Sequence, residues 1–154
     1  MITVLLIVHG LLAVFMLGAL THQTLSVWWP APAGHQSFFA SFRAVRAGSY
    51  ANTIVILYLL TATAGAILYP SYRLGIRVVL EDLRLNAANG IFELKEHFVA
   101  VGLGVLPAYW LFWRQPLSAG YAGTRKGLTA ILAVIVWWSF LVGHILNNIR
   151  GFGV

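Results

Sequence analysis

The chain has no cysteine among its 154 residues. Disulfide bonds, thiolate metal sites and covalent c-type haem attachment within this chain are therefore excluded. Charged residues are also scarce: they make up 9% of the chain, against roughly a quarter in ordinary soluble domains. Only four residues are acidic, whereas 60% are hydrophobic. So little polar surface cannot coat a water-soluble globule of this size, and the composition predicts an integral membrane protein.

Four apolar stretches predict four helical spans. They cover residues 2–29, 50–69, 91–113 and 128–149, and each is near or above the roughly 20 residues that a helix needs to cross the hydrocarbon. Backbone in lipid must satisfy its own hydrogen bonds, and strand alternation is absent, so the spans are expected to be helices. The predicted fold is all-α: a four-transmembrane-helix bundle that forms a single membrane domain over residues 1–154.

An even number of spans places both termini on the same side of the membrane. The expected location of the protein is a bacterial inner membrane. The first span is predicted to be a retained anchor, because it lacks a basic leader and is longer than a signal-peptide core. We call the end of the predicted bundle that carries both termini and the 70–90 loop end A, and the opposite end B. Lys and Arg divide evenly between the ends, so the positive-inside rule leaves the orientation open.

The two longer connections are predicted to be short interfacial helices. In SFFASFRAVR, residues 37–46, phenylalanines recur at helical spacing between polar residues. In YRLGIRVVLEDLRLN, residues 72–86, one face of an amphipathic lid at end A is expected to carry internal Arg/Glu pairs among Arg73, Arg77, Glu81 and Arg84. The basic residues border membrane spans, which favours anionic lipid headgroups over nucleic acid as their partners.

Three histidines lie at similar depth on three different predicted helices. His9, His97 and His144 each fall roughly 9 to 12 Å inside end A. A bundle can bring such residues face to face around a cofactor, and ionisable groups at membrane depth are functional candidates by default. Alternatively, each imidazole only donates a hydrogen bond that joins neighbouring helices. His22 lies near end B and His35 in a loop, so neither is expected to join the other three.

A b-type haem held by two of these three imidazoles is the cofactor that the pattern favours. On the face of His97, Ala100, Gly104 and Ala108 leave a smooth strip that a macrocycle or another helix could approach. Guanidinium groups suit the propionates of haem, and three are predicted to bind the cofactor at end A: Arg73, Arg77 and Arg84. Asn147 follows His144 at i+3, where its amide could set the imidazole tautomer or bind a quinone carbonyl.

The stretch IFELKEH, residues 91–97, carries two further candidates. Glu93 lies one turn before His97 on the same face, so it could orient the imidazole or accept a proton from a quinol. Lys95 and Glu96 are rotated off that face by roughly 160° and 100° and are expected to reach the interface or neutralise nearby charges. A zinc, copper or iron site built from the three histidines and Glu93 is an alternative. The helix dipole could also explain the acids without any chemistry.

The first 100 residues carry a pattern of known membrane proteins. The run VHGLLAVFMLGAL, the segment FRAVRAGSY before a span that ends LLTATAGAILYPSYR, and the lysine of FELKEH resemble the small four-helix proteins of the copper-resistance D type and the haem-binding, protoporphyrinogen-oxidase-like group. The resemblance implies a b-type haem, with His9 matching the first-span histidine and Lys95 the third-span lysine. His97 and His144 have no secure counterpart in that pattern.

The sequence therefore predicts a haem b protein that passes electrons, expected between the quinone pool and another subunit of a membrane redox complex. The chain has few residues outside its predicted spans to bind a soluble donor, so its partners are expected to be membrane lipid and membrane subunits. One alternative is a cofactor-free scaffold subunit whose polar residues only bond neighbouring helices. Another is a membrane oxidase or a metal-site protein.

Overall fold

Helices account for nearly the whole of the computed structural model, which describes residues 2–30, 37–43, 46–114 and 116–152. No strand occurs within these ranges. The four long helices are α1 (Ile2–Trp28), α3 (Ala51–Ser71), α5 (Asn86–Trp113) and α6 (Ala122–Phe152). The all-α prediction is confirmed.

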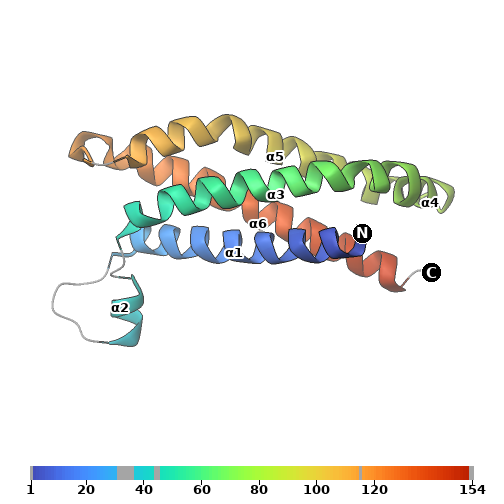
Figure 1. Cartoon of the computed structure of the whole chain (residues 1–154), viewed down its shortest axis with the longest axis horizontal. Helices are drawn as coiled ribbons and strands as arrows, with labels where there is room; N and C mark the ends of the chain where they lie inside the picture. The colour runs from blue at the N-terminus through green and yellow to red at the C-terminus, as the bar shows by residue number, and fades with distance from the viewer. Residues whose placement is uncertain (1, 31–36, 44–45, 115, 153–154) are drawn as a thin grey trace.

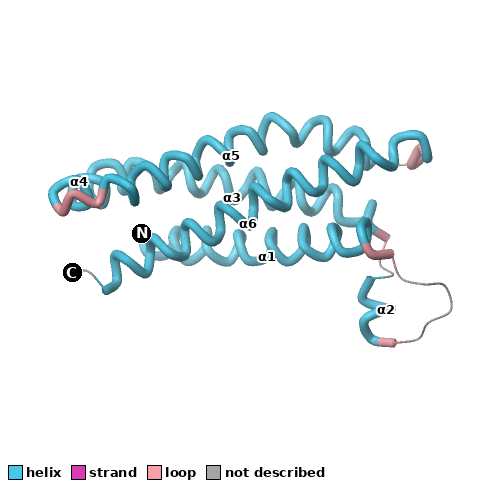
Figure 2. Tube along the Cα trace, turned by 180° about the vertical axis from the view of Figure 1, so that it is seen from behind, coloured by secondary structure: helices cyan, strands magenta, loops and turns pink. Residues whose placement is uncertain are grey.

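The long helices lie side by side as an elongated bundle (Figure 1). Both α1 and α5 pack against α3 and α6, so α1 and α5 face each other across the interior. The start of α1, the end of α6 and the short helix α4 (Arg77–Asp82) lie at end A, whereas α2 (Phe38–Arg43) lies at end B. Loops are confined to the two ends of the bundle (Figure 2).

Three helical stretches are long and apolar enough to cross a membrane: Ile2–Trp28, Ala47–Asp82 and Ala119–Asn147. They support the prediction of a transmembrane protein and match three of the four predicted spans. The stretch that contains α5 is not among them. Although α5 has 28 residues, its first half carries Glu93, Lys95 and Glu96, which lower its average hydropathy.

The interior is closely packed, while the outward faces of the helices are apolar. Tyr58, Tyr109 and Leu132 are among the fully buried side chains of the core. Large aliphatic and aromatic side chains such as Ile7 and Phe15 are more than half exposed on the outside. An apolar exterior around an interior that contains polar groups suits a helix bundle in lipid.

Of the two predicted interfacial helices, one forms as a separate short helix and the other continues from α3. A short helix, α2, forms at Phe38–Arg43 within the predicted 37–46 segment, of which residues 44–45 lie outside the described ranges. The second segment is not a separate helix: α3 runs into a π-helical turn, η2 (Tyr72–Ile76), and on into α4 without a break. Pro70 lies inside α3, and the π-helical turn follows it two residues later. The chain reverses only beyond α4, where Arg84 adopts a φ of 57°.

Candidate functional site

His9 lies at the interface of α1 with α3. Its Nδ1 is 3.1 Å from the backbone oxygen of Thr61. A carbonyl oxygen only accepts, so Nδ1 carries the proton, and the lone pair of the neutral ring is on Nε2. A Cβ atom at Gly65 would be 3.2 Å from Cε1 of the ring, so glycine lets α3 approach the imidazole this closely. His9 therefore has a fixed tautomer and a close fit against α3.

Lys95 and Glu96 form an ion pair in the half of α5 that is near end A. The distance from Lys95 Nζ to Glu96 Oε1 is 2.7 Å, and the Lys95 side chain is only 13% exposed. Lys95 Nζ also lies 4.3 Å from the ring centroid of Phe92. His9 is on α1, whereas Lys95 and Glu96 are on α5, on the opposite side of the bundle but in the same half near end A. We call His9, Lys95 and Glu96 the interior triad.

A second polar network joins α5 to the extension of α3 at end A. The Tyr72 hydroxyl donates to Asn89 Oδ1 at 2.9 Å, and its ring stacks on Phe92 with centroids 3.7 Å apart. Arg77 donates to Glu81 at 2.7 Å and to Glu93 at 2.8 Å. Of the Arg/Glu pairs expected within residues 72–86, the pair of Arg77 with Glu81 is thus present. Because Phe92 also contacts Lys95, this network adjoins the interior triad.

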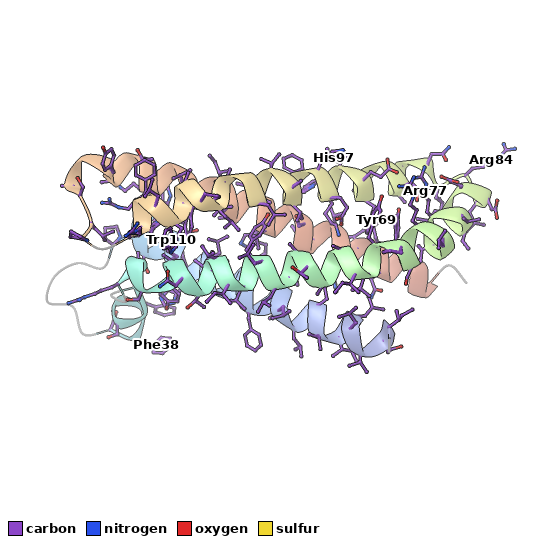
Figure 3. The ribbon with its side chains drawn as sticks, turned by 45° about the horizontal axis from the view of Figure 1, so that its top comes forward. Phe38, Tyr69, Arg77, Arg84, His97 and Trp110 are labelled. Atoms are coloured by element: carbon purple, nitrogen blue, oxygen red, sulfur yellow. The ribbon has the colours of Figure 1, made fainter. Side chains whose placement is uncertain are left out.

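The other two predicted histidine ligands point away from the interior. His97 is exposed on α5, where its Nδ1 lies 2.7 Å from the backbone oxygen of Glu93 (Figure 3). The Glu93 carboxylate, expected to orient this imidazole, binds Arg77 instead. His144 is exposed on α6 and stacks on Phe140, with ring centroids 6.3 Å apart.

The three imidazoles do not meet at one centre. Across the described ranges, no three His, Asp or Glu side chains are grouped so that they could hold a metal ion. The reason lies in the faces of α5. Lys95 and His97 are about 160° apart around the helix, so the rotation that turns Lys95 inward turns His97 outward. The strip that continues from His97 is also open, since Ala100 is exposed and a Cβ at Gly104 would meet nothing within 4 Å.

The remaining predicted cofactor residues lie at end A. Arg73 and Arg84 are exposed there, and Asn147 is exposed near the end of α6. The guanidinium of Arg77 already binds two carboxylates, so it is less available to a propionate than the other two arginines.

Two interior polar groups at end B were missed by the sequence reasoning. Gln23 and Tyr109 are both fully buried, and the Tyr109 hydroxyl donates to Gln23 Oε1 at 2.6 Å. Gln23 Nε2 in turn donates to the Ala47 oxygen at 2.9 Å. The signal was present in the sequence, because a glutamine within an apolar span requires a partner.

The hydrogen bond of His9 uses Nδ1, so Nε2 is the ring nitrogen that could bind a ligand. Histidines that bind metals commonly donate their second ring nitrogen to a carbonyl or carboxylate, as His9 does to Thr61. His97 and His144 are exposed on α5 and α6, whereas the Lys95 side chain on α5 is only 13% exposed. Comparisons with protein-family models, with curated proteins and with solved structures find no match to this chain.

Proposed function

We propose that the protein is a membrane-embedded electron-transfer subunit that binds b-type haem at the interior triad, with His9 as an axial ligand. The observation that supports this proposal is the Lys95–Glu96 ion pair, whose lysine side chain is only 13% exposed, in the same half of an apolar bundle as His9. Removing the lysine cation from water has an energetic cost, which its attraction to the partly exposed Glu96 offsets. Three ionisable groups gathered at this depth therefore favour a functional site over helix packing.

In this proposal α5 is the fourth span of the bundle. At 1.5 Å per residue its 28 residues extend about 42 Å, enough to cross a bilayer. Its charged residues lie in the half near end A, and the ion pair and Arg77 compensate them. Four spans would place both termini on one side of the membrane, as in a small subunit of a bacterial inner-membrane complex.

Each residue at end A has a role in the proposal. His9 would hold the iron, and bound haem would supply one-electron chemistry. Lys95 and Glu96 would balance the charge of the site or hold a proton, while the exposed Arg73 and Arg84 are suited to propionates. Glu93 would serve a quinol only if it were released from Arg77. Electrons would be exchanged within the membrane, with quinone or with a partner subunit.

A reduced-minus-oxidised absorption spectrum of the purified protein tests the haem assignment. We expect an α-band of the b type, and we expect His9→Ala to abolish most of it. His97→Ala and His144→Ala are matched controls on the outward faces of α5 and α6 and should retain the band. Full haem retention in His9→Ala, or loss only in the two controls, would contradict His9 as the ligand.

The competing proposal is a cofactor-free scaffold subunit. The observation that favours it is at end B, where buried polar groups satisfy one another, as Gln23 and Tyr109 do. A bundle that uses polar contacts for packing there could use the interior triad in the same way. A colourless preparation, purified from membranes that contain haem and still monodisperse, would support the scaffold and exclude the redox proposal.

A further inference from the structure

A small cavity opens at end B between the start of α3 and the end of α5, far from the interior triad. Its volume is about 230 Å³. Trp110 marks its place on α5 in Figure 3. The lining residues are Gly48, Ala51, Asn52, Trp110, Trp113 and Arg114.

Arg114 gives the cavity a positive charge. Its guanidinium carbon lies 4.9 Å from the ring centroid of Trp110, a cation–π arrangement that fixes the exposed cation at the rim. The four carboxylate side chains of the sequence lie on α4 and the first half of α5, and all three ion pairs found in the described ranges are at that end. Arg114 is thus a cation at the end of the bundle that lacks acidic side chains.

Asn52 supplies a second donor. Trp110 Nε1 donates a hydrogen bond to Asn52 Oδ1 at 2.9 Å. The amide oxygen of Asn52 therefore serves as the acceptor of this bond. The amide nitrogen then has its hydrogens available for another acceptor. A guanidinium and an amide N–H₂ on one small cavity match an oxyanion with several acceptor oxygens, which is the chemistry of phosphate.

The size and position of the cavity favour a lipid headgroup. Its volume is below the roughly 300 Å³ of the smallest typical ligand pockets, so it suits a phosphate with its glycerol carbons rather than a larger ligand. The walls are otherwise small or aromatic. Apolar side chains such as Leu59 on α3 and Leu111 on α5 are exposed on the same two helices, where acyl chains would lie. Tryptophans at the ends of spans are also typical of headgroup depth.

We propose that this cavity binds the phosphate headgroup of an anionic phospholipid, with Arg114 and Asn52 as its donors. The bound lipid would fill the end B opening between α3 and α5. This site is independent of haem binding at end A.

Lipid titration of the purified protein in detergent, followed by native mass spectrometry, tests the site. We expect phosphatidylglycerol to bind more tightly than phosphatidylcholine. Arg114→Gln should weaken phosphatidylglycerol binding about fivefold, the effect of one cation near a headgroup, and should leave phosphatidylcholine binding unchanged. Asn52→Leu, which removes a donor at an exposed position, should lower the same preference and carries the test if Arg114→Gln does not fold.

Lys126→Gln is the matched control, because it removes one positive charge at the same end but away from the cavity lining. It should change phosphatidylglycerol affinity by less than about twofold, since it leaves both donors in place. Equal losses in Arg114→Gln and Lys126→Gln would overturn the site in favour of diffuse attraction. Displacement of phosphatidylglycerol by an equal concentration of glycerol 3-phosphate would overturn the lipid assignment and indicate a site for a soluble phosphate.

Discussion

At the scale of single residues, Gly102 shows how one missing side chain fixes the packing of α3 on α5. Tyr58 is 2% exposed, and its hydroxyl donates to the Val99 oxygen at 3.0 Å. A Cβ atom at Gly102 would overlap this hydroxyl and lie 2.6 Å from Tyr58 Cζ. The bulky tyrosine and the absent side chain are therefore complementary.

Gly102→Ala is expected to destabilise the bundle, although alanine is the better helix former by about 1 kcal/mol. The overlap with Tyr58 should cost about 1–3 kcal/mol, as overpacking does elsewhere. Thermal unfolding in detergent, followed by circular dichroism, measures the change. Gly104→Ala on the same helix is the control, because a Cβ there meets nothing within 4 Å. An equal or higher midpoint for Gly102→Ala than for Gly104→Ala would refute the clash.

Residue identity alone indicated that the region around residue 95 is unusual, but not which side chain faces inward. His97 and Lys95 are both costly in lipid, and hydropathy gives no preference between their faces. Packing decides, because Gly102, Leu106 and Tyr109 on the same helix are buried. Turning these residues inward carries Lys95 with them and leaves His97 outside. The resemblance pointed to His9 and Lys95, and their joint role in a cofactor site remains a prediction.

At the scale of helices, Gln23 joins α1 to both the start of α3 and the end of α5. It accepts from Tyr109 and donates to the backbone of Ala47, the first residue of the turn η1 (Ala47–Tyr50). Gln23→Leu should cost about 1–3 kcal/mol, because it leaves a buried hydroxyl without its acceptor. Tyr109→Phe should cost less, and the double variant should lose less than the sum of the two single variants.

Thermal unfolding of these variants in detergent gives the coupling energy. Thr21→Ala is the control: it removes the acceptor of an exposed bond from Trp137 Nε1, 3.0 Å long, on the same turn of α1. We expect it to change stability by less than about 1 kcal/mol, as exposed hydrogen bonds do. Strict additivity of Gln23→Leu and Tyr109→Phe would show that the bond does not couple the helices.

The positions of the long helices could be predicted because apolar length is a local property. Residues 2–29 and 91–113 correspond closely to α1 and to the C-terminal part of α5. The joining of α3 to α4 could not, since Pro70 and the polar residues beyond it look like the end of a helix in the sequence. A π-helical turn and the contact of Tyr72 with Asn89 and Phe92 carry the helix on, and these depend on tertiary packing.

At the scale of the whole molecule, the bundle has unequal ends. End A contains the interior triad and the ion pairs of Arg77, whereas end B combines aromatic residues with cations that lack acidic neighbours. This difference between the two ends corresponds to the two sides of a membrane only if all the long helices cross it together. Among the four long helices, α5 has the weakest support from hydropathy as a membrane span, because Glu93, Lys95 and Glu96 lie in its first half. The proposed positions of both sites in the membrane therefore require that α5 crosses the bilayer.

The absence of cysteine makes this crossing directly measurable, since each introduced thiol will be the only one in the chain. Asn86→Cys and Ser118→Cys flank α5 at its two ends and are exposed. In sealed membrane vesicles that contain the protein, a membrane-impermeant maleimide should label one of them and not the other until detergent is added. Thr3→Cys, at the start of α1, should behave as Asn86→Cys does, because both lie at end A. Labelling of Asn86→Cys and Ser118→Cys from the same side would mean that α5 does not span the bilayer.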